Sequence, residues 1–220
     1  MPPDGLRERK KLRTRQLLAD VARRLFSEHG FENVSIAQIA DAADVSPATV
    51  FNYFPTKEDL VYSRLEEFES QLIDAIRNRG PGESVLDAFG RFILEPRGLL
   101  AVEDESAAAE LAAVVRMIAS SPALLAREQQ VLADYTQSLA RLLAEETAAR
   151  HGDQRPYVVA NTLMGVHRAL INHVRERLVA GPVDRRRLAR DVRRRGEAAL
   201  ALLGDGLAEY ARKRQPHARK

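Results

Sequence analysis

The chain has 220 residues, 45% of them hydrophobic and 30% charged, so it can bury a substantial core as one or two domains. It contains no cysteine, which excludes disulfide bonds and thiolate metal sites. The charged N-terminus does not look like a secretory signal, and no apolar run is long enough to span a membrane, so we expect a cytoplasmic protein without a membrane partner.

The net charge of +3 is unevenly distributed along the chain. Residues 1–80 carry 12 basic and 13 acidic side chains, whereas residues 184–220 carry 12 and 5. Residues 1–24 hold eight Arg or Lys, Arg13 among them, against three acids. Such a basic arm can follow a phosphate backbone; the alternative is a solvated, disordered tail.

Helix is favoured throughout by the low aromatic content and the many Ala, Leu and Arg residues, so we expect an all-α fold. The first long helix is predicted from about Lys11 to Glu28, with Gly30 as its terminator. Its buried face follows the helical period and comprises Leu18, Val21, Ala22, Leu25 and Phe26.

Residues 35–57 predict two short helices joined by a tight turn. Ser35 can cap the first, with Gln38 completing a capping box, and Ser46 can cap the second, with Pro47 in its first turn. The turn over residues 42–45 requires a positive φ, which Asp44 tolerates better than most residues. Apolar anchoring of the second helix is assigned to Val50, Phe51 and Phe54.

This pattern fits a helix-turn-helix, although an ordinary pair of capped helices in a bundle would carry the same caps. The short turn and the small polar residues on the open face of the second helix favour DNA binding, because they leave room for base edges and phosphates. The predicted DNA contacts are Arg13, Ser35, Ser46, Pro47, Ala48, Thr49, Asn52, Tyr53 and Lys57.

A long helix from Lys57 to about Asn78, capped by Thr56, is expected next, and Arg79-Gly80-Pro81-Gly82 marks a domain boundary. Further helices are predicted over 84–95, 106–120, 122–150, 156–179 and 184–204. The expected division is therefore a DNA-binding domain at 12–72, with its helix-turn-helix at 35–54, a C-terminal domain at 80–204 and a disordered tail at 205–220.

The last two long helices are apolar on more than one side. This surface either fills the core of its own domain or forms a self-complementary interface in a twofold dimer. The dimer is favoured, because one helix-turn-helix reads too few base pairs for useful specificity, whereas a dimer reads two half-sites. The predicted interface comprises Val159, Leu163, Val166, Leu170, Val174, Val192, Gly196, Ala199 and Leu203.

Candidate ligand contacts lie on or beside apolar faces of the C-terminal helices. They are Arg116, Met117, Tyr135, Asn161, Met164, His167 and Arg168, each of which could instead be a core residue or a paired polar residue. Convergence of Arg116, His167 and Arg168 would suit an acidic ligand. An enzyme is disfavoured, since the chain has no phosphate-cradling glycine loop, HExxH motif or nucleophile elbow, and no cofactor is expected.

Residues 12–72 resemble the DNA-binding domain of the TetR family of transcriptional repressors. The resemblance is carried by Ala19…Leu25-Phe26…Gly30-Phe31, Ser35-Ile36…Ile39-Ala40, Val45-Ser46-Pro47-Ala48-Thr49-Val50, Tyr53-Phe54 and Lys57-Glu58…Leu60. Asp44, at a position where the family usually has Gly, and Asn52, at a position often aromatic or His, depart from the pattern.

The resemblance implies an all-helical homodimer whose N-terminal three-helix unit binds a palindromic DNA operator through the major groove. The C-terminal domain would hold the dimer interface and a pocket for a small-molecule inducer, apolar or acidic, that releases the DNA. By position, Ser35, Tyr53 and Lys57 match phosphate contacts of the family. A ligand-independent activator or architectural DNA binder is the alternative, and a defined cavity in the C-terminal domain would separate the two.

Overall fold

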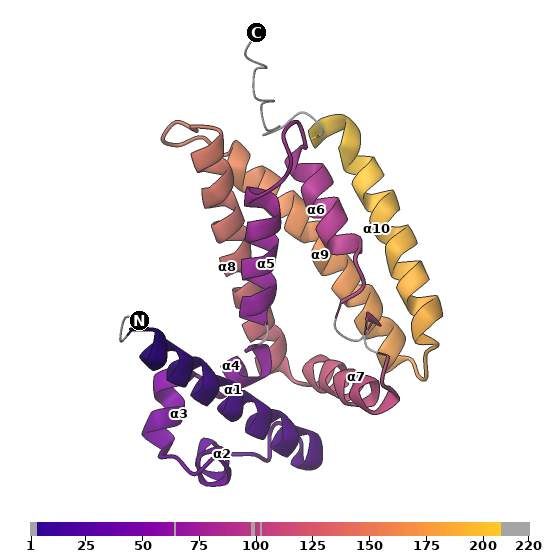
Figure 1. Ribbon diagram of the computed structural model, residues 1–220. Helices are drawn as coiled ribbons and strands as arrows, with labels where there is room; N and C mark the ends of the chain where they lie inside the picture. The colour runs from indigo at the N-terminus through magenta and orange to yellow at the C-terminus, as the bar shows by residue number, and fades with distance from the viewer. Residues whose placement is uncertain (1–3, 64, 98–99, 102, 208–220) are drawn as a thin grey trace.

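The computed structural model describes residues 4–63, 65–97, 100–101 and 103–207, and within these it contains helices and no strand (Figure 1). The all-α prediction is therefore confirmed. The helices are α1 (Asp4–His29), α2 (Ile36–Ala42), α3 (Pro47–Tyr53), α4 (Lys57–Tyr62), α5 (Leu65–Arg77), α6 (Val85–Leu94), α7 (Glu105–Ser120), α8 (Pro122–Glu146), α9 (Arg155–Val179) and α10 (Arg185–Leu207).

Helices α1 to α4 form a small unit at one end of the molecule (Figure 1). Helix α1 packs on α2 and α4, and α2 packs on α3. The core of this unit contains the apolar residues that the helical period assigned to it, among them Leu18, Ala22, Phe26, Ile39, Val50, Phe54 and Leu60. Short helices such as α2 and α3 derive their stability from this packing, because isolated helices of seven residues are not stable in water.

The longer helices form an upright bundle, with α7 lying crosswise at its base (Figure 1). Helix α8 packs along α9, and α10 packs against α6 and α9. Gly196 permits the close approach of α10, since a Cβ at this position would lie 2.6 Å from Leu94 Cδ2 and 3.3 Å from Leu170 Cδ1.

The bounds of three helices differ from the sequence-based prediction by three residues or more. Helix α1 begins at Asp4, so the basic residues from Arg7 onward lie on a helix and not on a disordered arm. Helix α8 ends at Glu146, four residues before the predicted end. Helix α10 continues to Leu207, so residues 205–207 of the predicted tail are helical, while 208–220 lie outside the described residues.

The prediction of one long helix from Lys57 to Asn78 is wrong, because the structure has two helices there, α4 and α5. Helix α4 packs against α1 and α8, whereas α5 packs against α6 and α8. At the end of α4 the Ser63 hydroxyl donates back to the Leu60 carbonyl at 3.1 Å, a side-chain bond that competes with the backbone bonds of the helix. The coupling between the two parts of the chain is therefore not a single rigid helix.

The predicted dimer residues lie largely inside their own subunit. Five are buried in the core between α9 and its neighbours, and the other four are half-buried against it, so the prediction is wrong for the buried set: Val159, Leu163, Val166, Leu170 and Gly196. The physical reason is that α9 contacts α6, α7, α8 and α10, so its apolar seam is already covered. The half-buried residues are Val174, Val192, Ala199 and Leu203.

No single helix in the described part of the chain has both the length and the apolar character needed to cross a membrane. Helices α7 and α8 meet that criterion only when taken together, and they are bent by 99° at the break between them.

Candidate nucleic-acid interface and junction cavity

The turn between α2 and α3 is built by backbone hydrogen bonds that end α2. The Asp44 N–H donates to the Asp41 carbonyl at 3.2 Å, and the Val45 N–H donates to the Ala40 carbonyl at 3.0 Å. This pair of bonds is a Schellman motif, which places Asp44 at the position that needs a left-handed backbone. Its φ is 54°, so the predicted positive φ is confirmed.

Both short helices begin with the predicted caps. Ser35 and Gln38 form the full capping box on α2, and the Ser46 hydroxyl accepts the Thr49 N–H at 3.1 Å. The Ser46 and Thr49 hydroxyls also lie 2.9 Å apart, which fixes the Thr49 side chain on the surface of α3. The predicted contacts Ser35, Ser46, Pro47, Ala48 and Asn52 are exposed, while Thr49, Tyr53 and Lys57 are half-buried.

One member of the exposed face of α3 was assigned incorrectly from the sequence. Phe51, expected to anchor the helix, is 50% exposed, whereas Val50 and Phe54 are fully buried. The helical period could have revealed this, because Phe51 lies about 100° round the helix from Val50. An aromatic ring on the open face supplies an apolar contact surface of the kind that meets thymine methyl groups.

The C-terminal end of α3 is tied to α1 by Arg15. Its guanidinium donates from Nη1 to the Tyr53 carbonyl at 2.8 Å and lies 4.3 Å from the centre of the Phe54 ring. A cation at this end also suits the negative end of the helix dipole. Arg15 therefore orients α3, whereas Arg13, two residues earlier, is exposed on α1.

Three polar contacts join the small unit to the start of α8. The Tyr62 hydroxyl donates to the Leu124 carbonyl at 2.7 Å, Arg127 Nε donates to Asp59 Oδ1 at 2.7 Å, and the Ser121 hydroxyl donates to Glu32 at 3.0 Å. Burial raises the pKa of the Tyr62 phenol well above its usual range, so it remains a donor.

A cavity of about 630 Å³ lies directly beside this junction. The small unit contributes Arg23 and Phe26 from α1 and Leu60, Val61 and Tyr62 from α4 to its wall. The bundle contributes mainly apolar residues of α7 and α9, together with Phe68 from α5. Its size and its apolar lining are those of a small-molecule site.

Only two of the seven predicted ligand contacts, Met117 and His167, line this cavity. Tyr135 and Met164 are buried in the core, and the Tyr135 ring lies 6.5 Å from that of Phe68. The remaining three are exposed on other faces of α7 and α9: Arg116, Asn161 and Arg168. Arg116 and Arg168 therefore do not converge with His167, and the condition set for an acidic ligand is not met. Surface exposure of these polar ends satisfies them without a partner from the core.

The three arginines that do line the cavity were missed from the sequence, because they come from separate parts of the chain: α1, the segment after α6, and α9. Each is paired: Arg23 with Asp20 at 2.8 Å, Arg97 with Glu95 at 2.7 Å and Arg175 with Glu128 at 2.6 Å. In the part of the chain that the structure describes, no group of three or more His, Asp or Glu side chains is placed to hold a metal ion.

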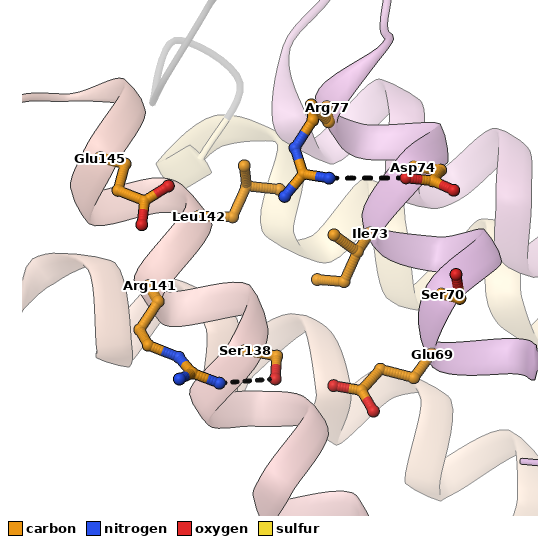
Figure 2. Close-up of a pocket in the computed structure, with 9 residues that line it drawn as sticks. All are labelled: Glu69, Ser70, Ile73, Asp74, Arg77, Ser138, Arg141, Leu142 and Glu145. Atoms are coloured by element: carbon orange, nitrogen blue, oxygen red, sulfur yellow. Dashed lines mark hydrogen bonds and ion pairs between the residues drawn. The ribbon is translucent and has the colours of Figure 1, made fainter. Parts of the chain in front are cut away.

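A second hollow, of about 410 Å³, lies between α5 and α8 (Figure 2). Charged and hydroxyl side chains surround Ile73 and Leu142 there, and Figure 2 shows the Arg77–Asp74 contact at 3.5 Å and the Arg141–Ser138 contact at 3.1 Å. Its mostly polar rim makes it less suited to an apolar ligand than the junction cavity.

Both parts of the chain match known protein families. Residues 18–62 match the family described as bacterial regulatory proteins, tetR family, and residues 86–190 match the MftR C-terminal domain of the same family group. The transcriptional regulator TcmR of Streptomyces glaucescens is 29% identical over 170 residues, which cover 76% of this chain and 75% of TcmR. The regulator LuxR of Vibrio harveyi is 50% identical over 50 residues, 23% of this chain and 24% of LuxR.

Among solved structures, GusR of Salmonella enterica has the same fold, with a TM-score of 0.51 and 19% identity over 89% of this chain and 96% of GusR. The helix-turn-helix geometry, the two family matches and the named relatives agree. The chain belongs to the TetR family of bacterial regulatory proteins and is a DNA-binding transcriptional regulator, not an enzyme.

Proposed function

We propose that this protein is a homodimeric repressor that binds a palindromic operator and is released by a small molecule. The observation that carries the proposal is the junction cavity, whose wall is shared by the DNA-reading unit and the C-terminal bundle. An occupant of this cavity touches α1 and α4 directly, so it can favour one relative arrangement of the two parts over another.

In this proposal the exposed side chains of α3 enter the major groove. Ala48, Phe51 and Asn52 read base edges, because they are exposed on the helix surface, and Thr49 contributes at its edge. Ser35, Tyr53 and Lys57 contact phosphates, as does Arg13 on the basic N-terminal part of α1. Pro47 and Ser46 set the start of the helix at the groove.

Two copies of the chain would pair through the outer faces of α9 and α10, not through the buried seam. Val158 is 57% exposed on α9 and Leu202 is 83% exposed on α10, so both side chains are available to a second subunit. Gly165 and Ala169 are exposed one turn apart on α9, and no atom lies within 4 Å of a Cβ built at Gly165. Small residues at this spacing allow two helices to approach closely.

Release would follow from a population shift. Ligand in the cavity would favour an arrangement in which the two α3 helices no longer match successive major grooves, so operator affinity falls. The contacts of α8 with Asp59 and Tyr62 would transmit the change, since α4 is held to α8 through them.

The proposal is tested by selecting bound DNA from a random pool with purified wild-type protein and with Asn52→Ala and Phe51→Ala. We expect each variant to change the base preference at particular positions of the selected site. Arg116→Ala, which removes an exposed charge from α7, is the matched control and should leave the profile unchanged. Unchanged profiles for both α3 variants would contradict the assignment of α3 as the reading helix.

A further inference from the structure

Building on the proposed ligand response, we propose that the junction cavity takes an uncharged, largely apolar molecule whose one polar group bonds to His167. The ligand is thereby assigned to a chemical class, and His167 is assigned as its hydrogen-bonding partner. The class follows from the charges in the wall, and the partner follows from the hydrogen bonding of the buried imidazole.

The charges in the cavity wall cancel one another. Three arginines and three glutamates line it, and the arginines already have carboxylate partners, as described above. In the Arg175–Glu128 pair, both oxygens of Glu128 accept from Arg175 Nη2 at 2.6 Å. The two side chains are 14% and 12% exposed, so the ion pair is largely shielded from solvent. Arg175 Nε has no hydrogen-bond partner, but an anionic ligand bound to it would lie beside the Glu128 carboxylate that already neutralises Arg175. Repulsion between two such anions in a poorly hydrated site is unfavourable.

His167 does not add a positive charge to the cavity wall. Its side chain is buried, and burial lowers its pKa to about 4, so the imidazole is neutral near pH 7. The electrostatics of the wall therefore favour an occupant without a formal charge, because transfer of an unpaired ion from water into such a site is costly.

The same imidazole lacks a hydrogen-bond partner. His167 is 8% exposed, and its Nε2 makes no hydrogen bond. An unsatisfied buried polar atom is destabilising, so a ligand group that satisfies it binds more tightly. The ring lies parallel to Phe68, with centroids 4.6 Å apart, and both residues belong to the cavity wall. Because Phe68 stacks on the face of the ring, it leaves the in-plane direction of a hydrogen bond to Nε2 uncovered by its own ring.

A matched pair of fluorescent probes tests the charge. N-phenylnaphthylamine is uncharged, and anilinonaphthalene sulfonate has the same ring skeleton with one added sulfonate. The chain has no tryptophan, so probe fluorescence is not obscured by protein emission. We expect one uncharged probe per subunit, bound about tenfold or more tighter than the sulfonate, because burial of an unpaired charge is unfavourable. Equal or tighter binding of the sulfonate would overturn the inference.

Three variants locate the bound probe. Val114→Phe fills the junction cavity and should abolish binding, whereas Ile73→Phe, placed in the hollow between α5 and α8, is the control and should leave it intact. His167→Met should weaken binding of N-phenylnaphthylamine about fivefold, the loss of one hydrogen bond, but not that of phenylnaphthalene, which lacks the N–H. Equal losses for both compounds, or none, would overturn the role of His167. Thermal melts confirm that each variant is folded.

Operator binding measured in parallel separates this inference from the proposed function. DNA binding without selective capture of the uncharged probe overturns the ligand class and leaves the regulator intact. Selective capture without any DNA binding supports the ligand class and contradicts the proposed function.

Discussion

The ammonium of Lys57 donates to the Phe31 carbonyl at 2.9 Å and lies 4.1 Å from the centre of the Phe31 ring. Lys57 thus holds the loop after α1 against the first turn of α4. An ammonium has three N–H donors, so this bond leaves others for a phosphate. The residue therefore has a structural role in addition to the phosphate contact predicted for it.

Lys57→Ala should weaken operator binding and also lower the stability of the fold. We expect a loss of about 1–2 kcal/mol in unfolding free energy from the lost hydrogen bond and cation–π contact. The salt slope of DNA binding should fall by about one unit, equally for all operator sequences. Urea titration and binding isotherms at several salt concentrations measure the two effects.

Tyr53→Phe is the matched comparison, because it removes one hydroxyl and no charge. It should lower operator affinity about fivefold with unchanged stability and an unchanged salt slope. A loss that depended on the operator sequence would contradict the phosphate roles of Tyr53 and Lys57.

Arg15→Ala should loosen the end of α3, because it removes the bond to the Tyr53 carbonyl and the contact with the Phe54 ring. We expect lower hydrogen-exchange protection in α3 and a stability loss of about 1–2 kcal/mol. Arg13→Ala removes the same charge from an exposed site on α1 and should change only the salt-dependent DNA affinity. Identical protection in the two variants would show that Arg15 does not position α3.

Local features of the helix-turn-helix could be predicted from the sequence because their causes are local. The caps at Ser35 and Ser46 and the positive φ of Asp44 depend on neighbouring residues alone. Phe51 was misassigned because its apolar type was given more weight than the helical period, which places it about 100° round the helix from the buried Val50.

Features set by packing between distant segments could not be predicted in the same way. The division of α4 from α5 depends on which neighbours each contacts, and the junction cavity brings together residues as distant as Arg23 and Arg175. An apolar seam on α9 looks the same in the sequence whether α8 and α10 or a second subunit covers it. For that reason the buried core of the bundle was mistaken for a dimer interface.

Two residues other than glycine have a left-handed backbone conformation at helix ends, and a further prediction follows from them. Asp44 has a φ of 54°, and Ala148, which follows α8, has a φ of 48°. Asp44→Gly and Ala148→Gly should each stabilise the fold by about 0.5–1 kcal/mol, because the relief of left-handed strain exceeds the added entropy of the unfolded chain. Chemical denaturation at neutral pH measures both.

Only Asp44→Gly should also strengthen DNA binding, since it removes a negative charge two residues before the cap of α3. Ala148→Gly is therefore its control for backbone effects remote from α3. Equal operator affinities for the two variants would contradict a repulsion between Asp44 and phosphate.

The buried imidazole of His167 predicts a loss of stability in acid. Because burial lowers its pKa from 6.5 to about 4, the unfolded chain binds more protons than the folded one between these values. The contribution of the neutral imidazole to the free energy of unfolding is fully present above pH 6.5 and declines as the pH falls toward 4. Wild type should lose about 2 kcal/mol more than His167→Met between pH 7 and pH 5, measured by urea denaturation. Parallel pH profiles would contradict a buried, neutral His167.

The most direct test of the central claim, that α2 and α3 read DNA as part of a symmetric pair, is selection of binding sites from random duplexes with the full chain. The account predicts an enriched palindrome with half-sites one helical turn or a multiple of it apart, about 34–36 Å per turn. Recovery of a single unrepeated half-site, or of no enriched sequence, would contradict it.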